Sequence, residues 1–258
     1  MYILIILARL AVIAYFFFGG LLYFKQHSLL YFPTPKVKHD FEEIVFEHQG
    51  EKLNIIVLNK GQQKAILYFG GNSEPVAINA DRFAKIFPDY SVYLVNYRGY
   101  GGSTGTPGEQ ENYADAKAIF ESLKTQHRDI SVMGRSLGSG IATYLASIKD
   151  VKKLVLITPY DSIQSVAQAR FPLHPMSLLL RDKYNSALKA KDVKAETLIL
   201  IAEHDETIKL KRTRKLIKAF TESRTAKRTP IISKTIKGAG HNTIIQSDSY
   251  YRFLQDFL

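Results

Sequence analysis

One serine in this sequence stands in a setting that suits covalent catalysis. Ser136 is the centre of residues 134–138, Gly-Arg-Ser-Leu-Gly, which fit the pattern G-x-S-x-G. A short apolar run, residues 130–133, precedes this pattern, and a helical pattern follows it. A nucleophile elbow needs this context, because the sharp turn raises the hydroxyl above the sheet and the glycines let neighbouring backbone pass closely. Ser136 is therefore the predicted nucleophile; the alternative is an incidental serine in an ordinary strand-to-helix turn.

A serine hydroxyl needs a base to remove its proton, and His241 is the predicted base. It stands in residues 238–242, Gly-Ala-Gly-His-Asn, directly after the last apolar run. A histidine on a glycine-flanked loop at the carboxyl edge of a sheet can reach a serine on the same edge. The other histidines lie near the N-terminus, at the ends of elements or in a proline-rich insert, and are His27, His39, His48, His127, His174 and His204.

The third member of such a triad is a carboxylate that fixes the imidazole tautomer and stabilises its cation. Asp205 follows the apolar run 197–202, and the order Ser136, Asp205, His241 is the chain order of α/β-hydrolases. Asp161 follows the run 153–158 and is the alternative acid. If it is not the acid, Asp161 is expected to cap the helix that follows it.

A developing oxyanion needs preorganised N–H donors. One is expected from the backbone of Leu137, the residue after the nucleophile. The other comes from the loop after the run 64–69, from Gly71 or Asn72; Asn72 is preferred because the glycines before it let the chain fold back toward Ser136. No cofactor is expected, and no spacing of His, Asp and Glu indicates a metal. The absence of cysteine excludes a thiol nucleophile and a Cys-based zinc site.

The chain that must position these residues has 258 residues, of which 46% are hydrophobic, enough for one large domain with a substantial core. Apolar runs of strand length alternate with helical patterns, including helices over 75–87 and 210–220. This alternation predicts an α/β fold, a mostly parallel sheet with helices on both faces. We expect one domain over residues 29–258, with a small cap formed by an insert over residues 159–192.

Residues 1–28 are predicted to form an N-terminal membrane anchor. The run from Met1 to Phe24 carries one charge, Arg9, and its length suits a hydrocarbon core of about 30 Å. A charge there costs about 2.5–3.5 kcal/mol unless it reaches the interface. A cleaved signal peptide is the main alternative, although its basic start and small-residue cleavage site are absent. The side of the membrane is left open; the lysines after the run lean weakly toward a cytoplasmic domain.

The net charge of +11 is concentrated in one stretch, residues 207–240, which carries eleven basic residues and one acid, Glu222. With a single aromatic residue inside the stretch, we do not expect it to bind nucleic acid. A solvated helix face, or a face lying against anionic lipid head groups, is expected instead. The basic residues are Lys209, Lys211, Arg212, Arg214, Lys215, Lys218, Arg224, Lys227, Arg228, Lys234 and Lys237.

Several stretches together resemble the membrane-anchored α/β-hydrolase-domain proteins, within the serine-aminopeptidase-like hydrolase superfamily. They run in family order from about Leu29 to Asn242: LLYFPTP, YFGGNSE, NYRGYGGSTGTPGE, VMGRSLGSGIATYLAS, LITPYDSI, LLLRDKYNS, LILIAEHDETI and GAGHN. Two positions depart from the family pattern: Gly70 replaces the histidine of His-Gly-Asn, and Lys209 stands near the position of a usual proline.

The resemblance implies a serine hydrolase acting on esters, thioesters or related acyl bonds, with Ser136, Asp205 and His241 as its triad. Together with the anchor and the basic stretch, it predicts a membrane-anchored enzyme whose acyl substrate is amphiphilic or a lipid. Two alternatives remain: a peptidase-type hydrolase of the same superfamily, and a catalytically silent member that binds a lipid or a protein.

Overall fold

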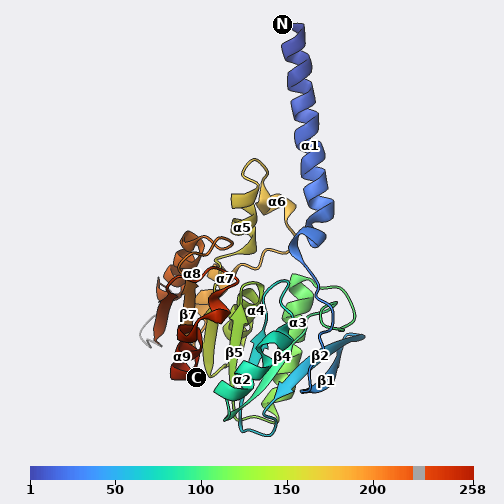
Figure 1. Cartoon of the computed structure of the whole chain (residues 1–258). Helices are drawn as coiled ribbons and strands as arrows, with labels where there is room; N and C mark the ends of the chain where they lie inside the picture. The colour runs from blue at the N-terminus through green and yellow to red at the C-terminus, as the bar shows by residue number, and fades with distance from the viewer. Residues whose placement is uncertain (223–229) are drawn as a thin grey trace.

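An eight-stranded sheet forms the centre of the molecule, whose computed structural model describes residues 1–222 and 230–258. The strands lie in the order β1-β2-β4-β3-β5-β6-β7-β8 (Figure 1). The pairs β1–β2 and β2–β4 are antiparallel and the other neighbouring pairs are parallel, which confirms the predicted mostly parallel sheet. The strands are β1 (Glu42–His48), β2 (Glu51–Leu58), β3 (Lys64–Phe69), β4 (Tyr90–Val95), β5 (Asp129–Arg135), β6 (Lys153–Ile157), β7 (Glu196–Ala202) and β8 (Ile231–Ile236).

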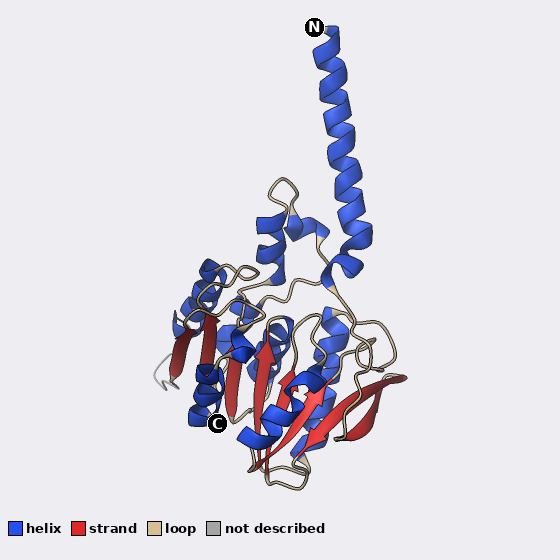
Figure 2. Cartoon of the chain, viewed as in Figure 1, coloured by secondary structure: helices blue, strands red, loops and turns tan. Residues whose placement is uncertain are grey.

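Helices cover both faces of the sheet, and this is why its central strands are continuous apolar runs (Figure 2). On one face lie α3 (Glu109–Lys124), α4 (Leu137–Ile148) and α8 (Leu210–Glu222). On the other lie α2 (Ala80–Ile86) and α9 (Asp248–Phe257). The helix expected over 75–87 divides in two, since residues 76–79 form a 3₁₀ turn before α2.

The insert between β6 and β7 carries three short helices above the carboxyl edge of the sheet (Figure 1). They are α5 (Ile163–Arg170), α6 (Met176–Leu179) and α7 (Ser186–Lys189). The first two form the cap, and α7 returns to pack on α4 and α8.

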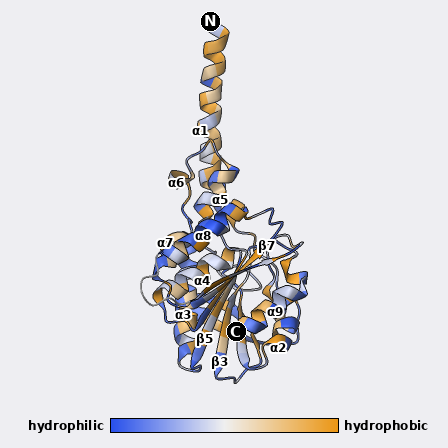
Figure 3. Cartoon of the chain, turned by 90° about the vertical axis from the view of Figure 1, so that its left-hand side faces the viewer, coloured by the Kyte–Doolittle hydropathy of each residue, from blue (hydrophilic) through white to orange (hydrophobic). Residues whose placement is uncertain are grey.

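The N-terminal helix α1 (Tyr2–Leu30) is long and apolar enough to cross a membrane, which makes it a candidate transmembrane helix. It projects from the domain on the side of the cap, and its surface is predominantly hydrophobic (Figure 3). Most of its residues are exposed, while Gly19 and Leu22 are buried against the domain.

A glycine-rich loop after β4 supports the segment beside Ser136. The Arg98 guanidinium donates to both carboxylate oxygens of Asp115 on α3, at 2.7 and 2.8 Å. From this loop and the residues before it, Tyr97 OH donates to Gly70 O (2.6 Å) and Tyr100 OH donates to Asn72 Oδ1 (2.8 Å). The loop therefore braces the chain that follows β3.

The basic stretch forms a solvated helix face in part. Lys211, Arg214, Lys215 and Lys218 are exposed on α8, and Lys218 pairs with Glu222 of the same helix. Three of the predicted basic residues lie outside the described residues: Arg224, Lys227 and Arg228.

Candidate active site

Three elements bring Ser136, Asp205 and His241 together at the carboxyl edge of the sheet. Ser136 directly follows β5, Asp205 follows β7, and His241 follows β8. His241 Nε2 lies 2.9 Å from Ser136 Oγ, and its Nδ1 lies 2.9 and 3.0 Å from the two oxygens of Asp205. The side chains of His241 and Asp205 are each 6% exposed, while Ser136 is only partly buried and stays open to a substrate.

The turn at Ser136 is sharp and strained. Ser136 has φ 48° and ψ −114°, a conformation that L-residues rarely adopt. A Cβ on Gly134 would lie 2.3 Å from Gly138 O, and a Cβ on Gly138 would lie 2.1 Å from Phe69 O. Both glycines of the G-x-S-x-G pattern are therefore required by close backbone approach.

Two backbone N–H groups hold Asp205 in place. Asp205 Oδ1 accepts from Thr207 N at 3.0 Å and from Ile208 N at 2.6 Å. These bonds orient the carboxylate toward His241 Nδ1, which is the geometry that keeps an imidazole in one tautomer.

Asp161, the alternative acid, lies in another environment. It is 1% exposed and pairs with Arg212 (3.3 Å) and Lys215 (3.2 Å) on α8. The expectation that it caps α5 is wrong, because Ser162 does so: its Oγ accepts from Ser165 N at 3.0 Å. Asp161 instead neutralises part of the basic face and ties α8 to the chain after β6.

The loop after β3 passes beside Ser136. A Cβ on Gly71 would lie 3.6 Å from Ser136 Cβ, and Gly138 N donates to Gly70 O at 3.2 Å. Gly71 N donates to Glu74 Oε2 at 2.6 Å, so this N–H is already engaged. The sequence left Gly71 and Asn72 open as the oxyanion donor from this loop. Because the Gly71 N–H is bonded to Glu74, the N–H of Asn72 is the remaining candidate.

The two expected oxyanion donors differ in what holds them. Leu137 is the first residue of α4, and a helix leaves its first N–H groups without an intrahelical acceptor. The Asn72 side chain fixes its own residue, because Nδ2 donates to Leu30 O (2.5 Å) and Oδ1 accepts from Phe32 N (3.0 Å). Asn72 thus also joins the candidate site to the end of α1.

Sequence reasoning missed a buried ion pair under the site. Glu74 Oε2 accepts from Arg135 Nη1 at 2.8 Å, and both side chains are almost fully buried. Glu74 Oε1 accepts from Tyr68 OH and Asn79 Nδ2, each at 2.6 Å. Burial lowers the pKa of Arg135, but the charge and hydrogen bond of Glu74 together with the nearby Tyr68 and Tyr250 outweigh it, so the pKa of Arg135 is raised. A charge at the second position of G-x-S-x-G was the available signal.

This ion pair connects the two loops that meet at Ser136. Glu74 holds Gly71 of the loop after β3, as described above. Arg135 Nη2 donates to His241 O and to Asn242 Oδ1, both at 3.3 Å. The loop beside the nucleophile and the loop carrying the base are therefore fixed to the same pair of charges.

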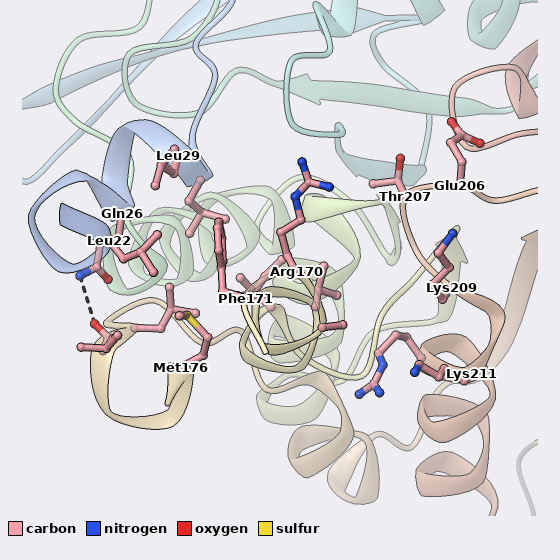
Figure 4. A pocket seen from close by; sticks show the side chains of 18 residues that line it. Leu22, Gln26, Leu29, Arg170, Phe171, Met176, Glu206, Thr207, Lys209 and Lys211 are labelled. Atoms are coloured by element: carbon pink, nitrogen blue, oxygen red, sulfur yellow. Dashed lines mark hydrogen bonds between the residues drawn. The ribbon is translucent and has the colours of Figure 1, made fainter. Parts of the chain in front are cut away.

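A cavity of about 560 Å³ lies between α1, the cap and the chain after Asp205 (Figure 4). One wall is apolar and includes Leu22 and Leu29 of α1 with Phe171 and Met176 of the cap. Ser136 and His241 are not among its lining residues; the cavity adjoins them through Glu206, whose Oε2 accepts from His241 N at 3.2 Å. Basic side chains also line the cavity, namely Arg170, Lys209, Lys211 and Arg212. Lys209 and Lys211 lie on the side away from α1 (Figure 4).

In the described residues, no group of three or more His, Asp or Glu side chains is placed to hold a metal ion.

Comparison with known proteins shows the family of this chain. A family model described as the alpha/beta hydrolase fold matches residues 69–178. An uncharacterized protein of Mycobacterium tuberculosis is 30% identical over 234 residues, covering 84% of this chain and 81% of that protein. The chain therefore belongs to the α/β-hydrolase family.

Other relatives and solved structures agree with this assignment. An uncharacterized membrane protein of Saccharomyces cerevisiae is 33% identical, over 65% of this chain and 60% of that protein. Lysophosphatidylserine lipase ABHD12 of Bos taurus is 29% identical, over 66% of this chain and 48% of its own, so the chain spans about half of that relative. An esterase structure from Pyrococcus furiosus shares the fold, with a TM-score of 0.68 at 18% identity over 89% of this chain and 97% of that one.

The elbow geometry predicts that Gly138→Ala destabilises the protein by about 1–3 kcal/mol, since the added methyl overlaps the Phe69 carbonyl. Denaturant unfolding measures this change. Gly20→Ala is the control, because a Cβ there meets nothing within 4 Å. Equal stability of the two variants would contradict the close approach.

The acid assignment predicts that Asp205→Asn leaves the fold intact but lowers turnover of a short ester by about 10⁴-fold, as in the comparable protease triad. Asp161→Asn removes the partner of Arg212 and Lys215, so its effect is on stability and turnover changes little. Steady-state kinetics together with thermal unfolding separates the two. A larger loss of turnover in Asp161→Asn would overturn the assignment.

The buried ion pair predicts that Glu74→Gln lowers the free energy of unfolding by about 3–5 kcal/mol, because Arg135 is left buried without a counter-charge. Turnover falls as well, since both loops at Ser136 lose a common support. The control is Glu42→Gln, which removes an exposed ion pair with Lys60 and should leave stability nearly unchanged. A Glu74→Gln variant as stable as this control would show that the pair carries no such role.

Proposed function

We propose that this protein is a serine hydrolase that cleaves an acyl ester or thioester through an acyl-enzyme. The observation that supports this most directly is His241, which lies between Ser136 and Asp205 within hydrogen-bond distance of both. The positive φ of Ser136 adds support. A strained backbone conformation persists only where the surrounding structure imposes it, and such strain is concentrated at active sites.

In the proposed cycle Ser136 Oγ attacks the acyl carbonyl carbon while His241 Nε2 accepts the hydroxyl proton. Negative charge develops on the carbonyl oxygen, where the N–H groups of Leu137 and Asn72 are the proposed donors. His241 then gives its proton to the leaving oxygen or sulfur, and the acyl group stays on Ser136. Water, deprotonated by His241, releases the acid and restores the enzyme. The cycle needs no cofactor and no metal.

The cavity favours an amphiphilic substrate with one acyl chain. Its apolar wall, which includes Leu22, Leu29 and Phe171, suits a hydrocarbon chain. Its basic part suits an anionic head group, because Lys209, Lys211 and other cations lie there. The bovine relative is a lysophosphatidylserine lipase, and lysophosphatidylserine is an anionic amphiphile of this kind.

We further propose that α1 anchors the protein in a membrane by a single span, with the side of the membrane left open. The length and hydropathy of α1 support this, as does the membrane protein among the relatives. The exposed cations of α8 would lie against anionic lipid head groups, at about 1 kcal/mol for each basic residue close to the surface.

The proposed function predicts that a fluorophosphonate probe labels the full-length protein on Ser136 and that the protein hydrolyses a short p-nitrophenyl ester. Peptide mass spectrometry locates the label, and Ser136→Ala, which keeps the fold but lacks the hydroxyl, is the control. A folded protein that takes no label and hydrolyses no ester would instead be a catalytically silent binding protein.

A further inference from the structure

The part of α1 from Tyr15 to Gln26 contacts the cap, and we call this line of contacts the seam. Tyr15 OH donates to Leu173 O at 3.0 Å, and the Tyr15 ring stacks on His174 with centroids 4.5 Å apart. A Cβ on Gly19 would lie 3.3 Å from His174 Cδ2, so a small residue is needed for this approach. The helix and the cap are therefore in direct contact at this level.

The seam continues to the end of the cap. Arg181 lies over the Tyr23 ring at 4.6 Å and donates to Tyr23 OH at 2.8 Å. Gln26 closes the seam, because it donates to Leu179 O (3.2 Å) and accepts from Arg181 N (2.7 Å). From Tyr15 to Gln26 the helix rises roughly 16 Å at about 1.5 Å per residue.

Most of this seam lies within the apolar part of α1. The apolar run, whose one charge is Arg9, ends at Phe24, and a hydrocarbon core of about 30 Å needs about 20 residues. Suppose that α1 spans a membrane and that the hydrocarbon core begins at Tyr2. The core then ends about 20 residues later along α1, and Tyr15 lies roughly 9 Å inside that second boundary. Any shift of the core toward Phe24 places Tyr15 deeper. The cap residues that contact Tyr15 must then lie in the membrane as well.

The cap segment at that level has the composition of a membrane-inserted loop. Residues 171–180, FPLHPMSLLL, carry no acidic residue, Lys or Arg, and Arg170 and Arg181 flank them. Leu173 and Leu178 of this one short segment are 78% and 80% exposed. Flanking arginines are typical of segments that end at a lipid interface.

Part of the backbone of this loop is hydrogen-bonded within the protein. Gln168 Nε2, whose amide carries two N–H donors, lies within hydrogen-bond distance of the carbonyls of Phe171 (3.3 Å), Pro172 (3.2 Å) and His174 (3.0 Å). The Leu173 carbonyl accepts from Tyr15 OH, as described above. Irregular backbone at membrane depth requires such internal partners, because hydrocarbon supplies none.

From these observations we infer that the cap tip, residues 171–180, is embedded in the hydrocarbon of the membrane beside α1. The inference rests on the proposed membrane anchor and goes beyond it. Because Leu22 of α1 and Phe171 and Met176 of the cap line the cavity, its apolar end then lies at the depth of lipid tails. An acyl chain reaches the candidate site from the leaflet, along the seam, without first entering water.

Tryptophan fluorescence tests this placement directly, since the chain has no tryptophan of its own. The full-length protein is placed in vesicles containing lipids brominated on the acyl chains. Leu173→Trp reports the cap tip, Leu10→Trp reports α1, and Val45→Trp on β1 is an exposed control far from the cap. We expect strong quenching of the first two variants and none of the third. Quenching of Leu10→Trp alone would overturn the inference and leave the anchor standing; no quenching of any variant would overturn both.

A second experiment asks whether the insertion matters for substrate access. Leu173 and Leu178 do not line the cavity, so changing both to Asp should leave turnover of a soluble short ester unchanged. Turnover of an ester carried in vesicles should fall roughly tenfold or more, because carboxylates are strongly disfavoured in hydrocarbon. The matched control changes Val45 and Ile78, two exposed residues elsewhere, to Asp. Equal losses for both esters, or no loss for either, would contradict access from the leaflet.

Discussion

The candidate site depends on a buried charge pair that lies beneath it. Glu74 and Arg135 are too deeply buried to be tolerated singly, so each requires the other. Glu74 binds the loop after β3 through Gly71 N, and Arg135 binds the loop after β8 through the carbonyl of His241. Two segments separated by more than 160 residues in sequence are thereby held at one distance from Ser136. The other hydrogen bonds of these segments, such as Tyr100 to Asn72 and His241 N to Glu206, hold one loop each, whereas this pair joins both.

Much of the fold could be predicted from the sequence because its signals are local. The strands over 64–69 and 231–236 match the predicted runs. The first is a central strand covered on both faces, and such a strand must be almost continuously apolar. The ends of the predicted strands show which residues lie at the carboxyl edge of the sheet. The structure brings three of these residues, Ser136, Asp205 and His241, together. Their catalytic roles remain a prediction until turnover is measured.

The unpredicted features arise from contacts between residues distant in sequence. The surroundings of Asp161 depend on the packing of α8 against the chain after β6, which no local pattern encodes. The Glu74–Arg135 pair spans 61 positions and depends on the crossover that places β3 beside β5. The seating of α1 on the cap joins Tyr15 to Leu173, and nothing in an apolar run shows which side of it is covered. In each case the residue types can be read from the sequence, but the residues that they contact in the fold cannot.

The central claim, an acyl-enzyme on Ser136, is tested most directly by acid-quenching the full-length protein during turnover of a slowly hydrolysed acyl ester. Peptide mass spectrometry then measures where the acyl group resides. The account predicts one acyl group on the peptide that contains Ser136, accumulating before steady state and absent from Ser136→Ala. Steady turnover with no acylated peptide, or with the acyl group on another residue, would contradict the proposed mechanism.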